Sequence, residues 1–65
     1  MRIILNGDAY DIEAETLEIA LSTLGYGGAA VATALNGSFI PSGARKTVVL
    51  AEGDEIEVLA PMRGG

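Results

Sequence analysis

The hydrophobic pattern at the start of the chain predicts a β-hairpin. Residues 2–6, RIILN, contain three consecutive aliphatic side chains, which is typical of a strand buried on both faces. Asn6-Gly7 follows, and this dipeptide is the strongest short-range signal for a type I′ hairpin turn. Residues 9–13, AYDIE, then alternate apolar and polar positions, so Tyr10 and Ile12 share one face. We therefore expect two antiparallel strands joined by a tight turn.

A short amphipathic helix is predicted next. Thr16 is a suitable N-cap, and Glu18 lies in the first turn, where the helix dipole favours a negative charge. Gly25 can adopt the left-handed conformation that ends many helices. Apolar residues recur between these signals at a spacing of three and four, at Leu17, Ala20, Leu21 and Leu24.

A second hairpin is predicted in the middle of the chain. Residues 29–36, AAVATALN, alternate in a way that directs Val31, Thr33 and Leu35 to one face. Thr33 departs from the larger apolar residue expected in this inward row. Asn36-Gly37 repeats the hairpin turn, and a short return strand begins at residues 39–40. Pro41 limits that strand to the edge of a sheet, because proline cannot donate a ladder hydrogen bond.

The last part of the chain predicts two further strands. Residues 42–46, SGARK, are expected to form a connector, and residues 47–50, TVVL, a short strand. Residues 52–54, EGD, form a turn. Residues 55–60, EIEVLA, are the final strand, which Pro61 ends.

These elements predict an α+β fold in which a mixed sheet packs on one helix, in the order ββαβββ. The opening and the final strands are the most apolar, so we expect them to be adjacent, parallel and central in the sheet. This arrangement is the ubiquitin-like β-grasp. We assign it to residues 1–61 and expect residues 62–65 to form a flexible C-terminal tail that ends in Gly-Gly.

Composition indicates one small folded domain. The chain has 65 residues, of which 49% are hydrophobic, and its formal net charge is −5. Its apolar runs are shorter than the ~20 residues that span a bilayer, and no signal peptide is expected at Met1. The absence of cysteine is compatible with a reducing cytoplasm. The negative charge disfavours nucleic acid and anionic membranes as partners and favours a basic protein surface.

The residue inventory argues against an enzyme. The chain contains no His, Cys or Trp, and its one lysine is Lys46. A His-based general base, a Cys–His pair and a zinc site are therefore excluded. A domain this thin also has little room for a ligand pocket of ~300 Å³ or more. We expect no bound cofactor or metal and no catalytic activity of the chain on its own.

The final strand carries a candidate partner-binding surface. Its alternation directs Ile56 and Val58 inward and leaves Glu57 and Leu59 on the outer face. If Phe39 or its neighbour Ile40 lies beside Leu59, the two would form an apolar patch next to the tail. The acidic residues around this strand would then dock electrostatically to a basic partner.

The chain ends in PMRGG, and its last two residues, Gly64 and Gly65, lack a Cβ atom. Without side chains, this segment can enter a narrow channel in another protein. Four extended residues, 62–65, reach roughly 13 Å beyond the sheet. Met62 and Arg63 are expected to contact the partner along the way.

Several motifs together resemble the ThiS family, the sulfur carrier proteins of thiamine biosynthesis. They are the helix TLEIALSTLG, then ALNGSFIP at residues 34–41, EGDEIEV at residues 52–58, and the terminal diglycine. The resemblance covers essentially the whole chain. It implies that a ThiF-like adenylyltransferase joins the carboxylate of Gly65 to AMP from ATP, and that sulfur from a cysteine desulfurase relay then replaces the AMP. It also implies that a ThiG-like thiazole synthase takes its sulfur from the resulting thiocarboxylate.

Two alternatives remain open at this point. The small subunit of molybdopterin synthase shares the fold, the diglycine and the chemistry, although 65 residues favour the thiamine branch. The second is a ubiquitin-like module of another class, either an interaction module with an inert tail or a protein modifier. In each case we expect the free protein to be a monomer.

Overall fold

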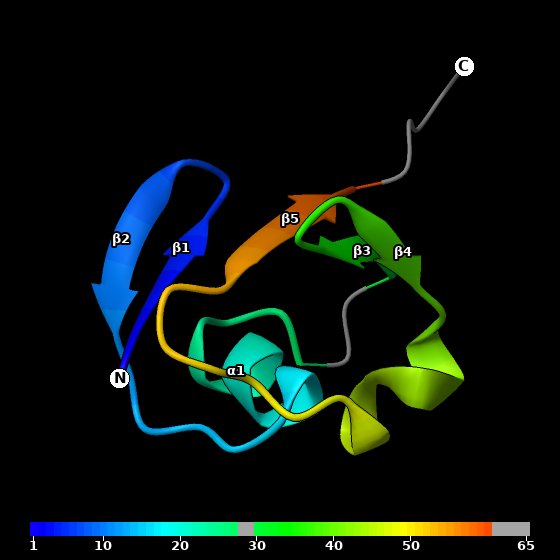
Figure 1. Cartoon of the computed structure of the whole chain (residues 1–65). Helices are drawn as coiled ribbons and strands as arrows, with labels where there is room; N and C mark the ends of the chain where they lie inside the picture. The colour runs from blue at the N-terminus through cyan, green and yellow to red at the C-terminus, as the bar shows by residue number, and fades with distance from the viewer. Residues whose placement is uncertain (28–29, 61–65) are drawn as a thin grey trace.

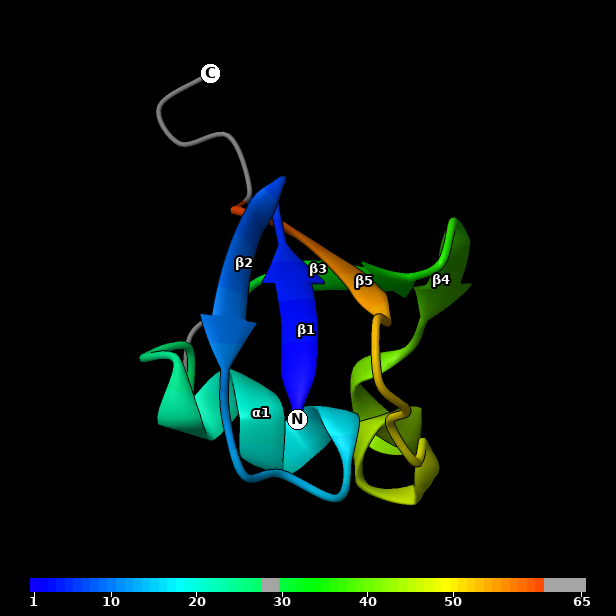
Figure 2. The same ribbon diagram turned by 60° about the vertical axis from the view of Figure 1, so that its left-hand side comes forward.

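A five-stranded mixed sheet lies over a single α-helix (Figure 1). The computed structural model describes residues 1–27 and 30–60. The elements in chain order are β1 (Arg2–Leu5), β2 (Asp8–Asp11), α1 (Leu17–Thr23), β3 (Ala32–Leu35), β4 (Ser38–Ile40), the 3-10 helix η1 (Ser42–Thr47) and β5 (Glu55–Leu59). Turning the molecule shows α1 beneath one face of the sheet, while no other helix or strand of the described residues lies over the opposite face (Figure 2).

The sheet has the strand order β2-β1-β5-β3-β4. β1 and β5 lie side by side and parallel, with Ile4 opposite Glu55 and Leu5 opposite Ile56. Both outer pairs are antiparallel hairpins, β1 with β2 and β3 with β4, and β5 also pairs antiparallel with β3. The order ββαβββ and the central parallel pair are confirmed, although the residue patterns indicate six strands where the described residues contain five. β4 is an edge strand, as Pro41 indicated.

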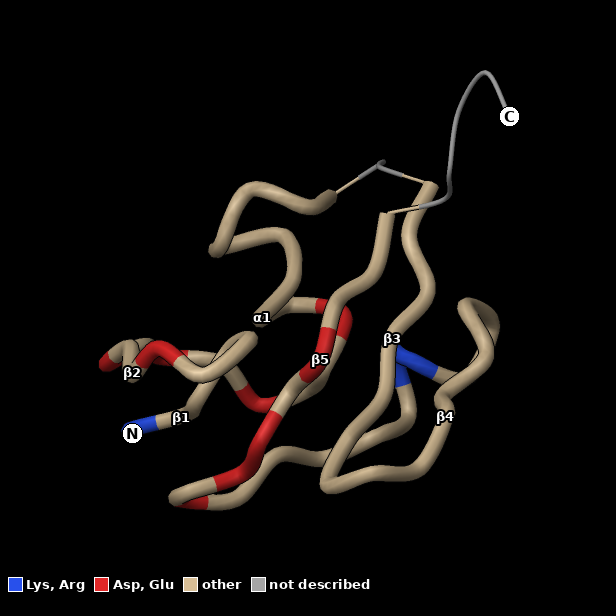
Figure 3. Tube along the Cα trace, turned by 90° about the horizontal axis from the view of Figure 1, so that it is seen from above, with Lys and Arg blue, Asp and Glu red and all other residues tan. Residues whose placement is uncertain are grey.

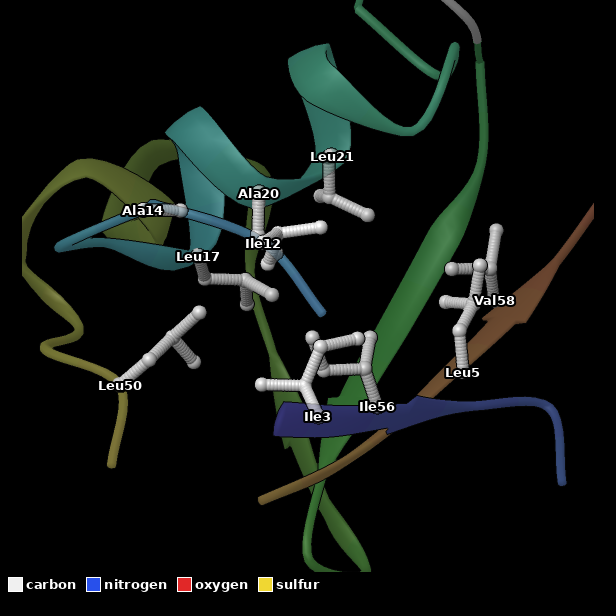
Figure 4. Close-up of a cluster of buried hydrophobic side chains, with 10 residues drawn as sticks. All are labelled: Ile3, Leu5, Ile12, Ala14, Leu17, Ala20, Leu21, Leu50, Ile56 and Val58. Carbon is white, nitrogen blue, oxygen red and sulfur yellow. The ribbon is translucent and has the colours of Figure 1, made fainter. Parts of the chain in front are cut away.

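The hydrophobic core lies between the sheet and α1 (Figure 4). Its ten buried side chains are Ile3, Leu5, Ile12, Ala14, Leu17, Ala20, Leu21, Leu50, Ile56 and Val58. Thr16 caps the helix, since its Oγ1 accepts a hydrogen bond from the amide of Ile19 at 3.3 Å. At the other end, Gly25 has φ +96°, and the amide of Tyr26 returns to the carbonyl of Leu21 at 2.7 Å. Both predicted helix ends are confirmed.

The predicted strand at residues 47–50 is wrong. This segment contributes a single bridge, between Val49 and Thr16. Its backbone bonds instead to the loop before α1: the Leu17 amide donates to the Val48 carbonyl, and the Leu50 amide donates to the Glu15 carbonyl. Leu50 is the buried residue of this apolar run, and its side chain anchors a loop in the core. The run therefore does not form a strand of the sheet.

The connector at residues 42–46 is also more regular than expected, because it forms η1. The strand bounds differ from the prediction as well, most of all at β2 and β3. β2 ends at Asp11, so Ile12 joins the core from the following loop, while Tyr10 remains 39% exposed at the sheet edge. β3 begins at Ala32 rather than at residue 29.

Candidate functional site

The uncovered face of the sheet carries the candidate partner-binding surface. In β5, Ile56 and Val58 point into the core, while Glu57 and Leu59 remain exposed, as predicted. Ala34 of β3 lies opposite Glu57 on one side and opposite Phe39 of β4 on the other. Three neighbouring strands thus present one row of outward side chains. We call Ala32, Ala34, Phe39, Glu57 and Leu59 the outer face.

The outer face is apolar and slightly hollowed. Phe39 is 67% exposed and Leu59 69% exposed, and both line a depression of about 250 Å³ together with Glu57. The predicted patch therefore exists, and Phe39 rather than Ile40 completes it. Ile40 lies opposite Thr33 and packs against the core. Large, exposed apolar side chains that line the same depression are typical of a binding surface.

Both Asn-Gly turns hold β5 in place. Asn6 has φ +49° and Asn36 has φ +50°, the left-handed values of a type I′ turn. The Asn6 side chain accepts from the amide of Val58 at 2.8 Å and donates to its carbonyl at 3.2 Å. At the other end of the strand, the Asn36 side chain accepts from the amide of Glu55 at 2.9 Å and donates to Asp54 at 3.0 Å. The strand that leads to the C-terminus is therefore fastened at both ends.

Thr33, the unexpected residue of the inward row, has polar partners. It is only 2% exposed, and its hydroxyl donates to the carbonyl of Ile40 at 3.2 Å. The same oxygen accepts a hydrogen bond from Nε of Arg45 at 3.1 Å, while Nη2 of Arg45 donates to the carbonyl of Val31 at 2.6 Å. A valine here would leave a buried donor without its acceptor. The threonine thus secures η1 to the sheet.

A larger hollow of about 580 Å³ lies at the end of the sheet beside Ala60. We call it the end hollow; its lining residues are Ala30, Val31, Ala32, Ser42, Arg45, Leu59 and Ala60. The expectation of little room for a pocket was therefore wrong. The reason is that η1, predicted as a mere connector, forms a wall beside the ends of β3 and β5.

Charge is distributed unevenly over the described residues. Acidic residues occur along β5 and its flanking turns, in β2 and in the segment that leads to α1, whereas basic residues occur in β1 and in η1 (Figure 3). The one ion pair within residues 1–27 and 30–60 joins the Met1 amino group to Asp11 at 3.3 Å. In the same residues no three metal-ligating side chains come together. No helix among them has the length and apolarity needed to cross a membrane.

The structure places three of the predicted site residues, Phe39, Glu57 and Leu59, on one surface. The other four, Met62, Arg63, Gly64 and Gly65, lie outside the described residues. Sequence reasoning missed Arg45 altogether. A signal existed, because a polar residue in an inward row requires a polar partner, and the nearest following arginine is Arg45.

Comparison with known proteins agrees with this geometry. A model of the ThiS family matches residues 3–65. The crystal structure of the thiamine biosynthesis protein ThiS from Geobacter metallireducens superimposes with a TM-score of 0.79 at 32% identity, covering 100% of each chain. A solution structure of a thiamine biosynthesis protein from the same organism gives a TM-score of 0.76 at 29% identity, covering 100% of this chain and 88% of that one. No curated protein sequence matches significantly.

The mixed sheet with its central parallel pair, packed on one helix, defines a ubiquitin-like β-grasp protein. The family match extends over nearly the whole chain, including the diglycine. The chain belongs to the ThiS family, which confirms the resemblance drawn from its sequence motifs.

Proposed function

We propose that this chain carries sulfur for the thiazole moiety of thiamine, on the carboxylate of Gly65. The observation that carries the proposal is the family match, which includes both the outer face and the final Gly64-Gly65. The Geobacter metallireducens protein that covers the whole chain is also a thiamine biosynthesis protein, which supports the thiamine branch over molybdopterin synthesis.

The chemistry requires activation because a carboxylate is a poor acyl donor. A ThiF-like adenylyltransferase lets the Gly65 carboxylate attack the α-phosphorus of ATP, which releases pyrophosphate and leaves an acyl adenylate. The terminal sulfur of a persulfide on the cysteine desulfurase relay then attacks the carbonyl carbon, and AMP departs, which leaves an acyl disulfide. A second thiol of the relay attacks the relay's own sulfur, so that the S–S bond breaks, a disulfide stays on the relay and the thiocarboxylate is released. The thiocarboxylate so formed donates its sulfur to a ThiG-like thiazole synthase. The partner consumes the ATP, and this chain is a co-substrate rather than a catalyst.

The fold presents the C-terminal segment to a partner by holding β5, the strand before it, in place. β5 is held by β1, by β3 and by the two asparagine side chains, so the point from which residues 61–65 depart is fixed. Leu59 lies two positions before that point, at the edge of the outer face. A partner that covers Phe39 and Leu59 would therefore have the tail beside it. Absence of a Cβ at Gly64 and Gly65 lets the backbone approach the reacting groups closely.

Pyrophosphate exchange tests the first chemical step. The cognate ThiF-like enzyme should incorporate labelled pyrophosphate into ATP only when this chain is present, because the acyl adenylate must form before it can revert. A chain that lacks Gly65 serves as the control and should not stimulate exchange. Exchange that is equally fast without the chain would contradict the proposal.

A further inference from the structure

The end hollow contains a cation that the acidic surface does not explain. Arg45 is half-buried, and its Nε and Nη2 bond to uncharged oxygens, those of Thr33 and the Val31 carbonyl. Within residues 1–27 and 30–60 no carboxylate pairs with it, although the chain has nine acidic residues. A guanidinium carries five N–H donors, so donors remain on its terminal nitrogens.

This guanidinium is already oriented. Thr33 is buried and bonded in turn to the Ile40 carbonyl, so the group that positions Arg45 is itself fixed. Binding would therefore cost little additional side-chain entropy, unlike binding by a free surface arginine. A fixed, planar, partly desolvated fork is the geometry that favours a bidentate pair with a carboxylate.

The position of the end hollow indicates who supplies that carboxylate. Ala32 and Leu59 line both this hollow and the depression that holds Phe39, so the two surfaces are continuous. Ala60, the residue before the tail segment 61–65, also lines the end hollow. An enzyme surface that extends from the outer face around the end of β5 towards Gly65 would pass the end hollow and Arg45.

Charge complementarity determines the sign of the contact. The enzyme's surface opposite Glu57 is expected to be basic, and more basic groups at the end hollow would be repelled by Arg45. From these observations we infer that the end hollow binds an aspartate or glutamate side chain of the adenylyltransferase, paired with Arg45. This inference rests on the proposed function. An acidic region on β5 and the positive charge of Arg45 at the end of the sheet would fix the direction in which the enzyme docks.

Three variants of the full chain isolate this contact, each measured by calorimetric titration into the cognate ThiF-like enzyme. Arg45→Gln removes the charge and should weaken binding by about 10-fold or more. Lys46→Gln changes the net charge equally, but Lys46 is exposed and lies outside the hollow, so binding should be close to that of the parent chain. Thr33→Val keeps the charge but removes the bond that orients Arg45, so binding should weaken less than it does for Arg45→Gln.

The pattern of losses decides the outcome. A loss that is clearly largest for Arg45→Gln and that shrinks as salt is raised supports the inference. Equal losses for Arg45→Gln and Thr33→Val would reduce Arg45 to a structural role, and normal binding by Arg45→Gln would overturn the inference directly. If the parent chain neither binds the enzyme nor stimulates pyrophosphate exchange, the proposed function itself has failed.

Discussion

Asn6 and Val58 are joined by a pair of hydrogen bonds that reproduce those of a neighbouring strand. The side-chain oxygen of Asn6 accepts from the Val58 amide at 2.8 Å, and its side-chain nitrogen donates to the Val58 carbonyl at 3.2 Å. The Asn6 amide also donates to the carbonyl of Ile56 at 2.9 Å, where the parallel pairing of β1 and β5 ends. One side chain thus extends β1 along β5, towards the end that leads to the tail.

We predict that Asn6→Gly loosens the end of β5. Glycine tolerates the left-handed backbone at this position, so the change removes the two side-chain bonds without backbone strain. Unfolding free energy measured with urea should fall by ~1–2 kcal/mol. Hydrogen exchange should accelerate at the Val58 amide more than at the amide of Ile4 in the centre of the sheet. Asn36→Gly is the matched control, since it should affect the Glu55 amide instead.

The asparagine contacts show where sequence reasoning succeeds and where it stops. Both Asn-Gly turns were predictable because the dipeptide itself favours the type I′ geometry. The helix ends at Thr16 and Gly25 were predictable for the same local reason. The hydrogen bonds between the two asparagine side chains and β5 were not predictable. They join residues that are 52 and 19 positions apart, and they form only when the sheet is complete.

The candidate site divides in the same way. Alternation in β5 places Leu59 outside and Val58 inside whatever the partner strand is. Whether Phe39 lies on the same face as Leu59 depends on the register of the β3–β4 hairpin, which the turn between the two strands sets. The end hollow could not be foreseen, because SGARK has no apolar period that distinguishes a 3-10 helix from a connector. Similarly, residues 47–50, TVVL, have the composition of a strand. Their backbone hydrogen bonds, however, are made with the loop before α1, which the sequence pattern does not reveal.

Thr33→Val should destabilise the fold although it makes the inward row more apolar. The variant loses the bond to the Ile40 carbonyl and leaves Nε of Arg45 without its acceptor. We expect the unfolding free energy to fall by ~1–2 kcal/mol. Thr47→Val is the control, because the Thr47 hydroxyl donates to the carbonyl of Ala44 within η1, and this hydrogen bond is exposed to solvent. Greater stability of Thr33→Val in urea unfolding would contradict the role given to this hydroxyl.

Leu59→Ala should weaken binding to the ThiF-like enzyme while the fold is retained. The side chain is 69% exposed, so its removal costs little core packing, whereas at a covered interface an apolar anchor carries much of the binding energy. We expect a loss of about 10-fold or more in affinity. Val49→Ala provides the control, since Val49 is 74% exposed and lines neither the depression on the outer face nor the end hollow. Equal affinities for Leu59→Ala and the parent chain would place the docking surface elsewhere.

Glu57→Lys should act mainly on the rate of association. Glu57 is exposed on the outer face, and charges of this kind steer an encounter more than they hold the complex together. Stopped-flow measurements at low salt should show slower association with the ThiF-like enzyme, and the difference should shrink as ionic strength rises. An equal loss at low and high salt would instead indicate a direct contact that the lysine blocks.

Gly64→Ala should slow sulfur loading without changing the unfolding free energy. One methyl group in a narrow channel displaces the reacting carboxylate, and a misplacement of ~1 Å can cost ~10²-fold in rate. Gly43→Ala is the matched control, since a Cβ at Gly43 meets no atom within 4 Å. Gly27→Ala should also load normally, although its Cβ would lie 3.1 Å from Oγ of Ser22 and lower stability slightly. Loading of Gly64→Ala at the parent rate would argue against a tight channel.

Intact mass spectrometry of the loaded chain tests the central claim most directly. After incubation with ATP, the ThiF-like enzyme and the sulfur relay, the parent chain should gain the mass of one sulfur in place of one oxygen, located at Gly65. A variant that lacks Gly65, or that has one residue added after it, should gain none while its circular dichroism spectrum is unchanged. Sulfur acquired by the extended variant would contradict a carrier whose chemistry takes place on the Gly65 carboxylate.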